Sequence, residues 1–314
     1  MTIDVPNTPR AARIALIAYR GVQDSAVLGI EDVLQVSNRI ACQLGSPQIA
    51  HKILRCGDLP SAQAFDAVVL PPNLSGQRGR KDASLTQWIA EQHREGATVC
   101  SACAGAFWLG HAGLLDGSPA TTHWALEEEF RCAFPKVQLH PEHLIIDDHD
   151  IVTAGGVMAW VDLGLYLVRR WQGAEVLSRT CRHMLIDPHG REQRNYRSFR
   201  PRLDHGDVPI RSLQQWMEQH AAENLSLPGL AERSRLSTRT LQRRFRTATG
   251  LSIREYLQEL RIERAKGLLE RTATPVNEIC WAVGYEDTST FSRLFRSICG
   301  VSATEYRRRF SVRE

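Results

Sequence analysis

Hydrophobic and polar positions follow two rhythms along the chain, one over the first two-thirds and another over the last hundred residues. The first part contains short apolar runs of strand length, separated by stretches with helical spacing. The runs cover 13–19, 48–54, 64–71 and 96–102, and the helical stretches include 29–44, 83–93 and 159–171. Residues 144–156 predict a hairpin that returns to the sheet. Strands that alternate with helices predict an α/β domain with a mostly parallel, buried sheet.

The last hundred residues contain an internal repeat. Residues 237–256 and 287–306 match at a distance of fifty positions, with nine identical pairs that include Arg243/Arg293 and Phe245/Phe295. Chance does not readily supply such a match. We therefore expect one small structural unit to be built twice.

Each copy predicts an amphipathic helix with defined ends. Ser237 and Asp287 are residues that cap helix starts, and Gly250 and Gly300 are residues that end helices. The predicted buried stripes are Leu241, Phe245 and Ala248 in the first copy and Phe291, Phe295 and Ile298 in the second. The outward faces carry Arg239, Gln242, Arg243 and Arg246, and Ser289, Ser292, Arg293 and Arg296. Such side chains read base edges and bind phosphate in a major groove.

A shorter helix is predicted before each of these two. Leu230, Ala231 and Leu236 form its apolar side in the first copy, and Ile279, Cys280, Val283 and Tyr285 do so in the second. Helix, tight turn and helix make the DNA-binding helix-turn-helix, and Gly284 stands where the second turn needs a positive φ. Residues 253–270 predict a connecting helix. The whole tail is expected to be an all-α domain with two helix-turn-helix units.

Charge favours this interpretation over a solenoid or a bundle with solvated arginines. Residues 1–210 hold 21 Lys and Arg against 23 Asp and Glu, whereas residues 211–314 hold 18 against 12. The tail is therefore the basic part of the chain, as expected for a nucleic-acid partner. Two copies are also too few for a solenoid.

The tail resembles the DNA-binding domain of the AraC/XylS family of bacterial transcription regulators. The resemblance rests on the LAERSRLSTRTLQRRFRTATGLSIREYL, RIERAKGLL and VNEICWAVGYEDTSTFSRLFRSICGVSATEYR segments. It implies that both recognition helices enter successive major grooves of promoter DNA. It places base-reading positions on Arg239, Gln242, Arg243, Ser289, Thr290 and Arg293, of which Thr290 comes from the resemblance alone. It also implies a homodimer, formed through the N-terminal domain, and RNA polymerase as a partner.

The chain is long enough for two domains. We expect an effector-sensing domain at 1–195, a linker at 196–210, which is rich in Arg, Pro and Asp, and a DNA-binding domain at 211–314. The N-terminus has no apolar signal core and no run reaches membrane-spanning length, so a cytoplasmic location is expected.

Metal and cofactor sites are not expected. The eight cysteines are scattered, and the lone pair Cys100 and Cys103 lacks the second pair that zinc needs. His140 and His143 stand near the acidic run 147–150, but such groups usually form a solvated turn.

Residues 96–107 (GATVCSACAGAF) predict a sharp strand-to-helix turn, an elbow with Cys103 at its tip. CAGAFWLGHAGLLDGSPATTHW, GVQDSAVLGIEDVL and TAGGVMAWVDLGLYLV resemble the PfpI/ThiJ branch of the class I glutamine amidotransferase-like superfamily. Regulators that join such a domain to an AraC-type tail form the GlxA group. The resemblance implies a small effector at the elbow, in a pocket lined by Cys103, Ala104, His123, Trp124 and Ala26.

The elbow lacks the groups that would activate its thiol. Active relatives carry an acid where this chain has Ala26 and a histidine where it has Ala104. Their oxyanion loop is glycine-rich, whereas here it reads LPPNLSG, and Pro72 has no N–H to donate. His123 or Asp24 could still approach the thiol, and Cys103 could equally be a small buried residue. We therefore expect no catalytic residues.

The sequence favours a transcription regulator, an activator, that responds to a small metabolite, for which the resemblance suggests a nitrogenous compound. The first alternative is a thiol-dependent amidase or hydrolase with a DNA-binding tail, which thiol-dependent turnover would reveal. The second is a structural nucleoid-type protein, which would bind DNA without sequence preference.

Overall fold

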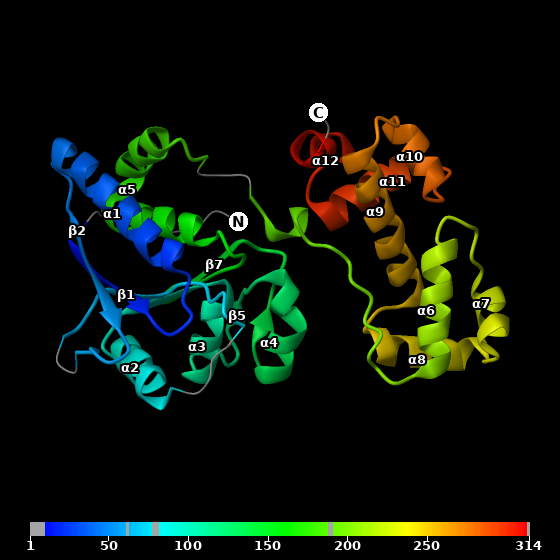
Figure 1. Ribbon diagram of the computed structural model, residues 1–314, viewed down its shortest axis with the longest axis horizontal. Coiled ribbons are helices and arrows are strands. Elements are labelled where there is room, and N and C mark those ends of the chain that lie inside the picture. Colours follow the sequence, from blue (N-terminus) through cyan, green and yellow to red (C-terminus); the bar gives the residue numbers. More distant parts are fainter. Residues whose placement is uncertain (1–9, 61–62, 77–81, 188–190, 313–314) are drawn as a thin grey trace. The chain divides into compact units, whose positions relative to one another are not determined.

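A computed structural model describes residues 10–60, 63–76, 82–187 and 191–312. Two compact units divide the chain, Met1–Gln193 and Arg194–Glu314. The first is an α/β unit and the second is entirely helical in its described part (Figure 1). The predicted fold class is confirmed. No helix among the described residues is both long and apolar enough to cross a membrane.

The first unit is built on a six-stranded sheet with the order β2-β1-β3-β4-β8-β7. All neighbouring strands are parallel except β7 and β8, which form the predicted hairpin and pair in antiparallel fashion. The strands are β1 (Ala12–Ala18), β2 (Ile49–Arg55), β3 (Ala67–Leu70), β4 (Thr98–Ala102), β7 (Ile145–Asp148) and β8 (Ile151–Ala154).

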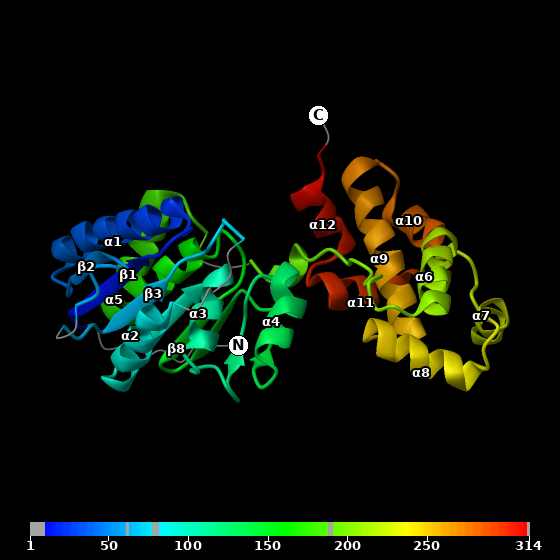
Figure 2. The ribbon, with the colours of Figure 1, turned by 60° about the horizontal axis from the view of Figure 1, so that its bottom comes forward.

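Helices cover both faces of this sheet. On one face lie α1 (Asp24–Leu44) and α5 (Trp160–Met184), and on the other lie α2 (Ala83–Arg94) and α3 (Ala106–His111), as Figure 1 and Figure 2 show. A hydrophobic core lies on each face of the sheet, and alternate residues of β1 point into one or the other. Ile14 and Leu16 pack with α1 and α5, whereas Ala15 and Ile17 pack on the opposite face. Burial on both faces explains why the central strands β3, β4 and β8 are mainly apolar and are buried along their whole length.

Several short elements lie between α3 and β7. A small parallel pair joins β5 (Pro119–Ala120) to β6 (Gln138–Leu139), and α4 (Glu127–Ala133) lies between these two strands in the sequence. Phe130 of α4 is fully buried and packs edge-on against Phe107 of α3. Two-residue strands are too short to produce an alternating pattern, so the sequence pattern did not indicate them.

The second unit contains two three-helix groups joined by one long helix. The first group consists of α6 (Val208–His220), α7 (Leu227–Ser234) and α8 (Thr238–Thr249), and the second consists of α10 (Val276–Ala282), α11 (Thr288–Cys299) and α12 (Ala303–Phe310). Helix α9 (Ile253–Arg271) runs from one to the other (Figure 1). Tyr256 and Leu260 of α9 enter the first core, whereas Ile262, Ala265 and Leu269 enter the second.

The segment expected as a linker, 196–210, is attached to the second unit rather than free. Helix α6 begins within it at Val208, and the unit itself begins at Arg194, two residues before the expected boundary. The Phe199 ring packs edge-on against Tyr256 at 5.3 Å, and the Phe199 N–H donates to Glu263 Oε2 at 3.1 Å. These long-range contacts, invisible in a local pattern rich in Arg, Pro and Asp, explain the difference.

Candidate nucleic-acid interface and elbow site

Helices α8 and α11 begin and end at the predicted residues. Ser237 Oγ accepts the Thr240 N–H at 3.3 Å, and Asp287 accepts the Ser289 and Thr290 N–H groups at 3.1 and 2.8 Å. Both helices end at a left-handed glycine, Gly250 or Gly300. The caps satisfy amides that would otherwise lack partners at each helix start.

The two turns that precede these helices differ in detail. Gly284 has the predicted positive φ, +92°, and a Cβ there would lie 2.4 Å from the Ala222 carbonyl oxygen. In the first helix-turn-helix the left-handed residue of the turn is Arg235, with φ of 53°. A glycine is therefore required only in the second turn, where backbone approaches backbone.

Each recognition helix buries one side and exposes the other. Leu241, Phe245, Phe291 and Phe295 are completely buried, whereas Ala248 is 6% exposed. The stripe of α11 ends on Cys299, since Ile298 is only partly buried. The exposed sides carry all eight residues expected to meet DNA: Arg239, Gln242, Arg243, Arg246, Ser289, Thr290, Arg293 and Arg296.

The exposed residues of α8 and α11 form a cationic face on each helix. Neither helix contains an acidic residue, so nothing within the helix neutralises its arginines. Thr290 is engaged locally, because its hydroxyl donates to Asp287 and accepts from Arg293 Nη2 at 3.4 Å. The Thr290 hydroxyl bond also lowers the pKa of Asp287. Thr290 therefore supports the helix start as well as lying on the exposed face.

Cys103 occupies the tip of a strained turn between β4 and α3. Its φ is 54°, unusual for a residue with a side chain, and it begins a single 3₁₀ turn, Cys103–Gly105, that leads into α3. Gly105 allows this turn, because a Cβ there would lie 2.1 Å from the Leu70 carbonyl oxygen. Cys103 and Ala104 are 4% and 3% exposed. The geometry is that of an elbow.

The loops after β1 and β3 meet at the same edge of the sheet. The Gln23 N–H donates to the Pro72 carbonyl at 2.8 Å, and Val22 pairs with Asn73. Ala26 lies in the first turn of α1 and is completely buried. The carboxyl ends of strands in an open α/β sheet are where ligands bind.

Tyr19 and Gln23 also lie at this edge, and the sequence pattern did not single them out. The Tyr19 hydroxyl donates to the Pro71 carbonyl, and burial, followed by the proximity of Cys103, raises the pKa of Tyr19. Tyr19 is thus a neutral donor. Gln23 is 6% exposed, and its Oε1 accepts no hydrogen bond from the described residues.

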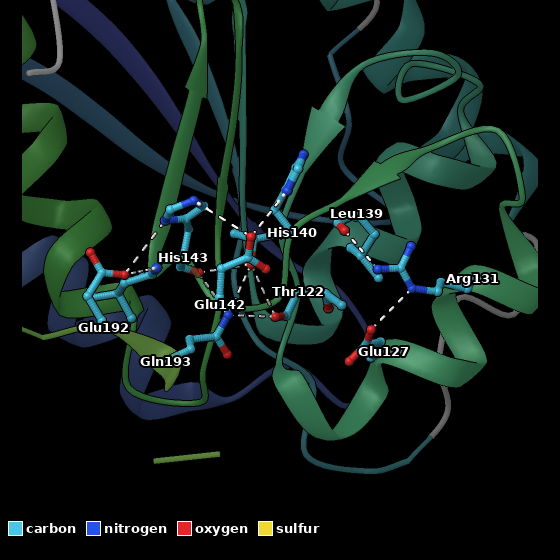
Figure 3. Close-up of polar contacts among 11 residues, drawn as sticks. Thr122, Glu127, Arg131, Leu139, His140, Glu142, His143, Glu192 and Gln193 are labelled. Carbon is cyan, nitrogen blue, oxygen red and sulfur yellow. Dashed lines mark hydrogen bonds and ion pairs between the residues drawn. The ribbon is translucent and has the colours of Figure 1, made fainter. Parts of the chain in front are cut away.

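The segment that carries His123 and Trp124 is tied to the elbow by Thr122. The Thr122 hydroxyl donates to the Cys103 carbonyl at 2.8 Å. His123 is half-buried and its Nδ1 accepts the Ala125 N–H at 3.0 Å, while its ring lies 5.3 Å from that of Trp124. Thr122 itself is held by Gln193 from the end of the first unit (Figure 3). The Thr122 hydrogen bond therefore connects the Cys103 turn to the segment that carries His123 and Trp124.

No group of three or more His, Cys, Asp or Glu side chains arranged to hold a metal ion occurs among the described residues. His140 and His143 instead contact the Glu142 carboxylate, at 3.2 and 3.8 Å (Figure 3).

Known protein families match both units. The helix-turn-helix domain family matches residues 230–309, and the DJ-1/PfpI family matches residues 31–170. The HTH-type transcriptional regulator CdhR of Pseudomonas aeruginosa is 31% identical over 235 residues, which cover 71% of this chain and 67% of that protein. GbdR of the same species is 30% identical over 258 residues, covering 79% and 67%. GlxA of Rhizobium meliloti is 27% identical over 220 residues, covering 69% and 67%.

Proposed function

Because the chain belongs to the AraC-type helix-turn-helix transcription regulators that carry a DJ-1/PfpI domain, we propose that it reads promoter DNA with both α8 and α11. The observation that carries this proposal is the repeated exposed face of arginines and hydrogen-bonding side chains, without an acid in either helix. Arg239, Gln242, Arg243 and Arg246 serve one groove, and Ser289, Thr290, Arg293 and Arg296 serve the next. Arginine binds guanine through two parallel hydrogen bonds, which supports base reading.

In vitro selection tests this proposal without knowledge of the target. The full chain is incubated with a pool of random duplexes, and the enriched duplex is footprinted. Protection in two major grooves about 34 Å apart on one face of the DNA is the expected result. Protection of one groove alone would refute reading by both helices, and enrichment of no sequence would favour a structural DNA binder.

The first unit is proposed to sense a small metabolite at the elbow. Cys103, Ala104, Ala26, His123 and Trp124 belong to segments that meet around the carboxyl ends of the strands. Gln23 Oε1 is buried and accepts no hydrogen bond from the residues that the structure describes, and an amino or amide N–H of a ligand could donate to it. This unmet acceptor supports the nitrogenous class of effector.

We propose that the elbow binds rather than catalyses. The resemblance to the PfpI/ThiJ branch aligns Ala26 with the acid of active relatives, so no carboxylate is expected there. The Tyr19 phenol, whose pKa is raised by burial, cannot accept the thiol proton at neutral pH. The strained φ of Cys103 is the observation that favours a thiol-dependent hydrolase instead. A covalent adduct on Cys103, formed during turnover of an amide or ester, would establish that alternative.

We further propose that the protein activates transcription, forms a homodimer through the first unit and contacts RNA polymerase. They follow from the family rather than from a contact within this chain. In vitro transcription from a promoter that contains the selected duplex, together with the molar mass in solution by light scattering, tests these three points. Repression or a monomer would contradict them.

A further inference from the structure

Residues 199–207 of the second unit lie before its first helix and outside the helix-turn-helix family match, which begins at residue 230. This segment is held at both ends. The Phe199 ring packs edge-on against Tyr256 of α9, and the Asp207 carboxylate accepts two hydrogen bonds from Arg244 of α8 (Figure 1). The 199–207 segment is therefore a fixed part of the unit that carries α8.

A buried amide holds the middle of the 199–207 segment. Gln214 of α6 is 1% exposed, and its Nε2 donates to the Arg202 carbonyl at 3.0 Å. The His205 Nδ1 atom accepts the Asp207 N–H at 3.0 Å, so the ring hydrogen is on Nε2, which lies 2.8 Å from Gln214 Oε1 and donates to it. The backbone at Arg202 is thus fixed relative to α6, and moving it would leave a buried amide unsatisfied.

A cavity of about 290 Å³ lies between the 199–207 segment and α8. Arg202 lines it from the segment, and Arg243 and Arg244 line it from α8. The lining also includes Asp207, but both oxygens of this carboxylate are held by Arg244. Arg202 and Arg243 therefore make the cavity cationic.

The Arg202 guanidinium also pairs with a carboxylate on its own segment. Its Nε lies 3.1 Å from Asp204 Oδ1, and the two side chains are 49% and 80% exposed. An ion pair this exposed is weak, because water competes for both charges and salt screens them. Arg202 can therefore exchange Asp204 for a stronger anionic partner.

The cavity is adjacent to the surface of α8 that is proposed to meet DNA. Arg243 belongs to both, since it is exposed on that surface and also lines the cavity. A helix about 10–12 Å wide fills a major groove about 12 Å wide, so the phosphates of the two strands lie along its sides. A guanidinium presents pairs of N–H groups that match phosphate oxygens.

We propose that Arg202 binds a phosphate of the DNA strand that borders the groove read by α8, with this phosphate at the cavity beside Arg243. The DNA interface then extends beyond residues 230–309 into the 199–207 segment. The inference rests on the proposed function, since it requires α8 to lie in a major groove. A phosphate carries no sequence information, so Arg202 positions the protein on the duplex rather than selecting a sequence.

The salt dependence of binding tests this contact. The full chain first selects a duplex from a random pool, and Kd is then measured at several salt concentrations for the natural chain and for Arg202→Ala. Loss of one phosphate contact should lower the slope of log K against log salt by about 0.9 and weaken binding about fivefold at about 0.15 M salt. The loss should be equal for the selected duplex and for its single-base variants.

Two further variants serve as controls. Arg200→Ala removes the same charge from an exposed residue two positions away that does not line the cavity, and it should leave the affinity and the slope nearly unchanged. Arg202→Lys keeps the charge at the cavity and should retain the slope. Circular dichroism should show the same Tm for all three variants, because these side chains are exposed.

Methylphosphonates, which are neutral, locate the contact on the DNA. Each phosphate of the selected duplex is replaced in turn. We expect one position, close to the base pair at which Arg243→Ala relaxes selectivity, to weaken binding of the natural chain about fivefold and to have no effect on Arg202→Ala. Losses that are the same at every position in the natural chain and in Arg202→Ala overturn the contact.

The remaining outcomes separate the two levels of inference. Failure of the full chain to select any duplex overturns DNA reading and this contact with it. A selected duplex for which Arg202→Ala changes neither affinity nor slope, or for which Arg200→Ala causes an equal loss, overturns the contact alone. Relaxed selectivity at one base pair in Arg202→Ala replaces the phosphate contact with base reading.

Inorganic phosphate distinguishes a DNA phosphate from a free anion at the cavity. We expect it to compete with the duplex no better than chloride at equal ionic strength. Stronger competition that requires Arg202, without an effect of methylphosphonate at any single position, overturns the DNA contact in favour of a site for free phosphate.

Discussion

The Arg244 guanidinium holds both carboxylate oxygens of Asp207, with Nε 2.9 Å from Oδ2 and Nη2 2.7 Å from Oδ1. The same carboxylate accepts the Ile210 N–H at 3.2 Å and so begins α6. One acid therefore ties the start of α6 to the recognition helix α8. The matching position in the second copy is Leu294, a partly buried apolar residue, so the two recognition helices are held by different forces.

Replacement of Asp207 by Asn should weaken the hold on α8 while preserving the cap of α6, because Asn is an equally good capping residue. We expect a lower Tm and weaker footprint protection in the groove read by α8, with protection by α11 retained. The control is Asp204→Asn, which removes only a pairing with Arg202 in an exposed segment. Equal loss of protection in both grooves would contradict separate support of the two helices.

The same pair predicts a dependence of stability on pH. The Arg244 hydrogen bonds hold the pKa of Asp207 below its unfolded value of about 3.9. Because the folded pKa is the lower one, the pair stabilises the protein fully above that value and loses its contribution as pH falls through the folded pKa. Calorimetry should show the Tm gap between the natural chain and Asp207→Asn at pH 6 shrinking below pH 4. A constant gap down to pH 3 would refute the assignment.

Arg243 and Arg293 are expected to read bases. Replacement of either by Ala should weaken binding to the selected duplex by about 1–3 kcal/mol and relax selectivity at one base pair in the corresponding groove. Binding to all single-base variants of the duplex measures this. A uniform loss across the variants would instead identify a phosphate contact.

Cys103 is expected to be unreactive, because it is 4% exposed, whereas Cys42 and Cys132 are exposed. Iodoacetamide should alkylate Cys103 about tenfold more slowly than those two thiols, as followed by peptide mass spectrometry. Cys103→Ser should keep the affinity for the selected duplex. Preferential alkylation of Cys103 would reveal an activated thiol and favour the hydrolase.

Gly105 is expected to be indispensable to the elbow. Gly105→Ala brings a methyl group against the Leu70 carbonyl, a backbone atom that cannot move aside, and should lower the free energy of unfolding by about 1–3 kcal/mol. Gly57→Ala is the matched control, since no atom lies within 4 Å of its added Cβ. Urea unfolding followed by circular dichroism measures the free energy of unfolding of both variants. Equal stability of the two would show that the turn at Gly105 can shift to accept the added methyl group.

The sequence by itself determined the helix-turn-helix repeat, the caps at Ser237 and Asp287, and the alternation of strands and helices along the first part, which indicated the fold class. These features arise from local periodicity and from side chains that bond their own backbone within one turn, so they can be read along the chain. The elbow at Cys103 was equally visible, because small residues follow a strand of strong apolar character.

Only the tertiary structure decided which side chains hold the helices and loops in place. Asp207 meets Arg244 across 37 positions, Tyr19 meets Pro71 across 52 and Gln193 meets Thr122 across 71. Cys299, and not Ile298, completes the buried stripe of α11. Such contacts produce no periodic pattern in the sequence, because the partners of a buried amide or carboxylate come from distant parts of the chain.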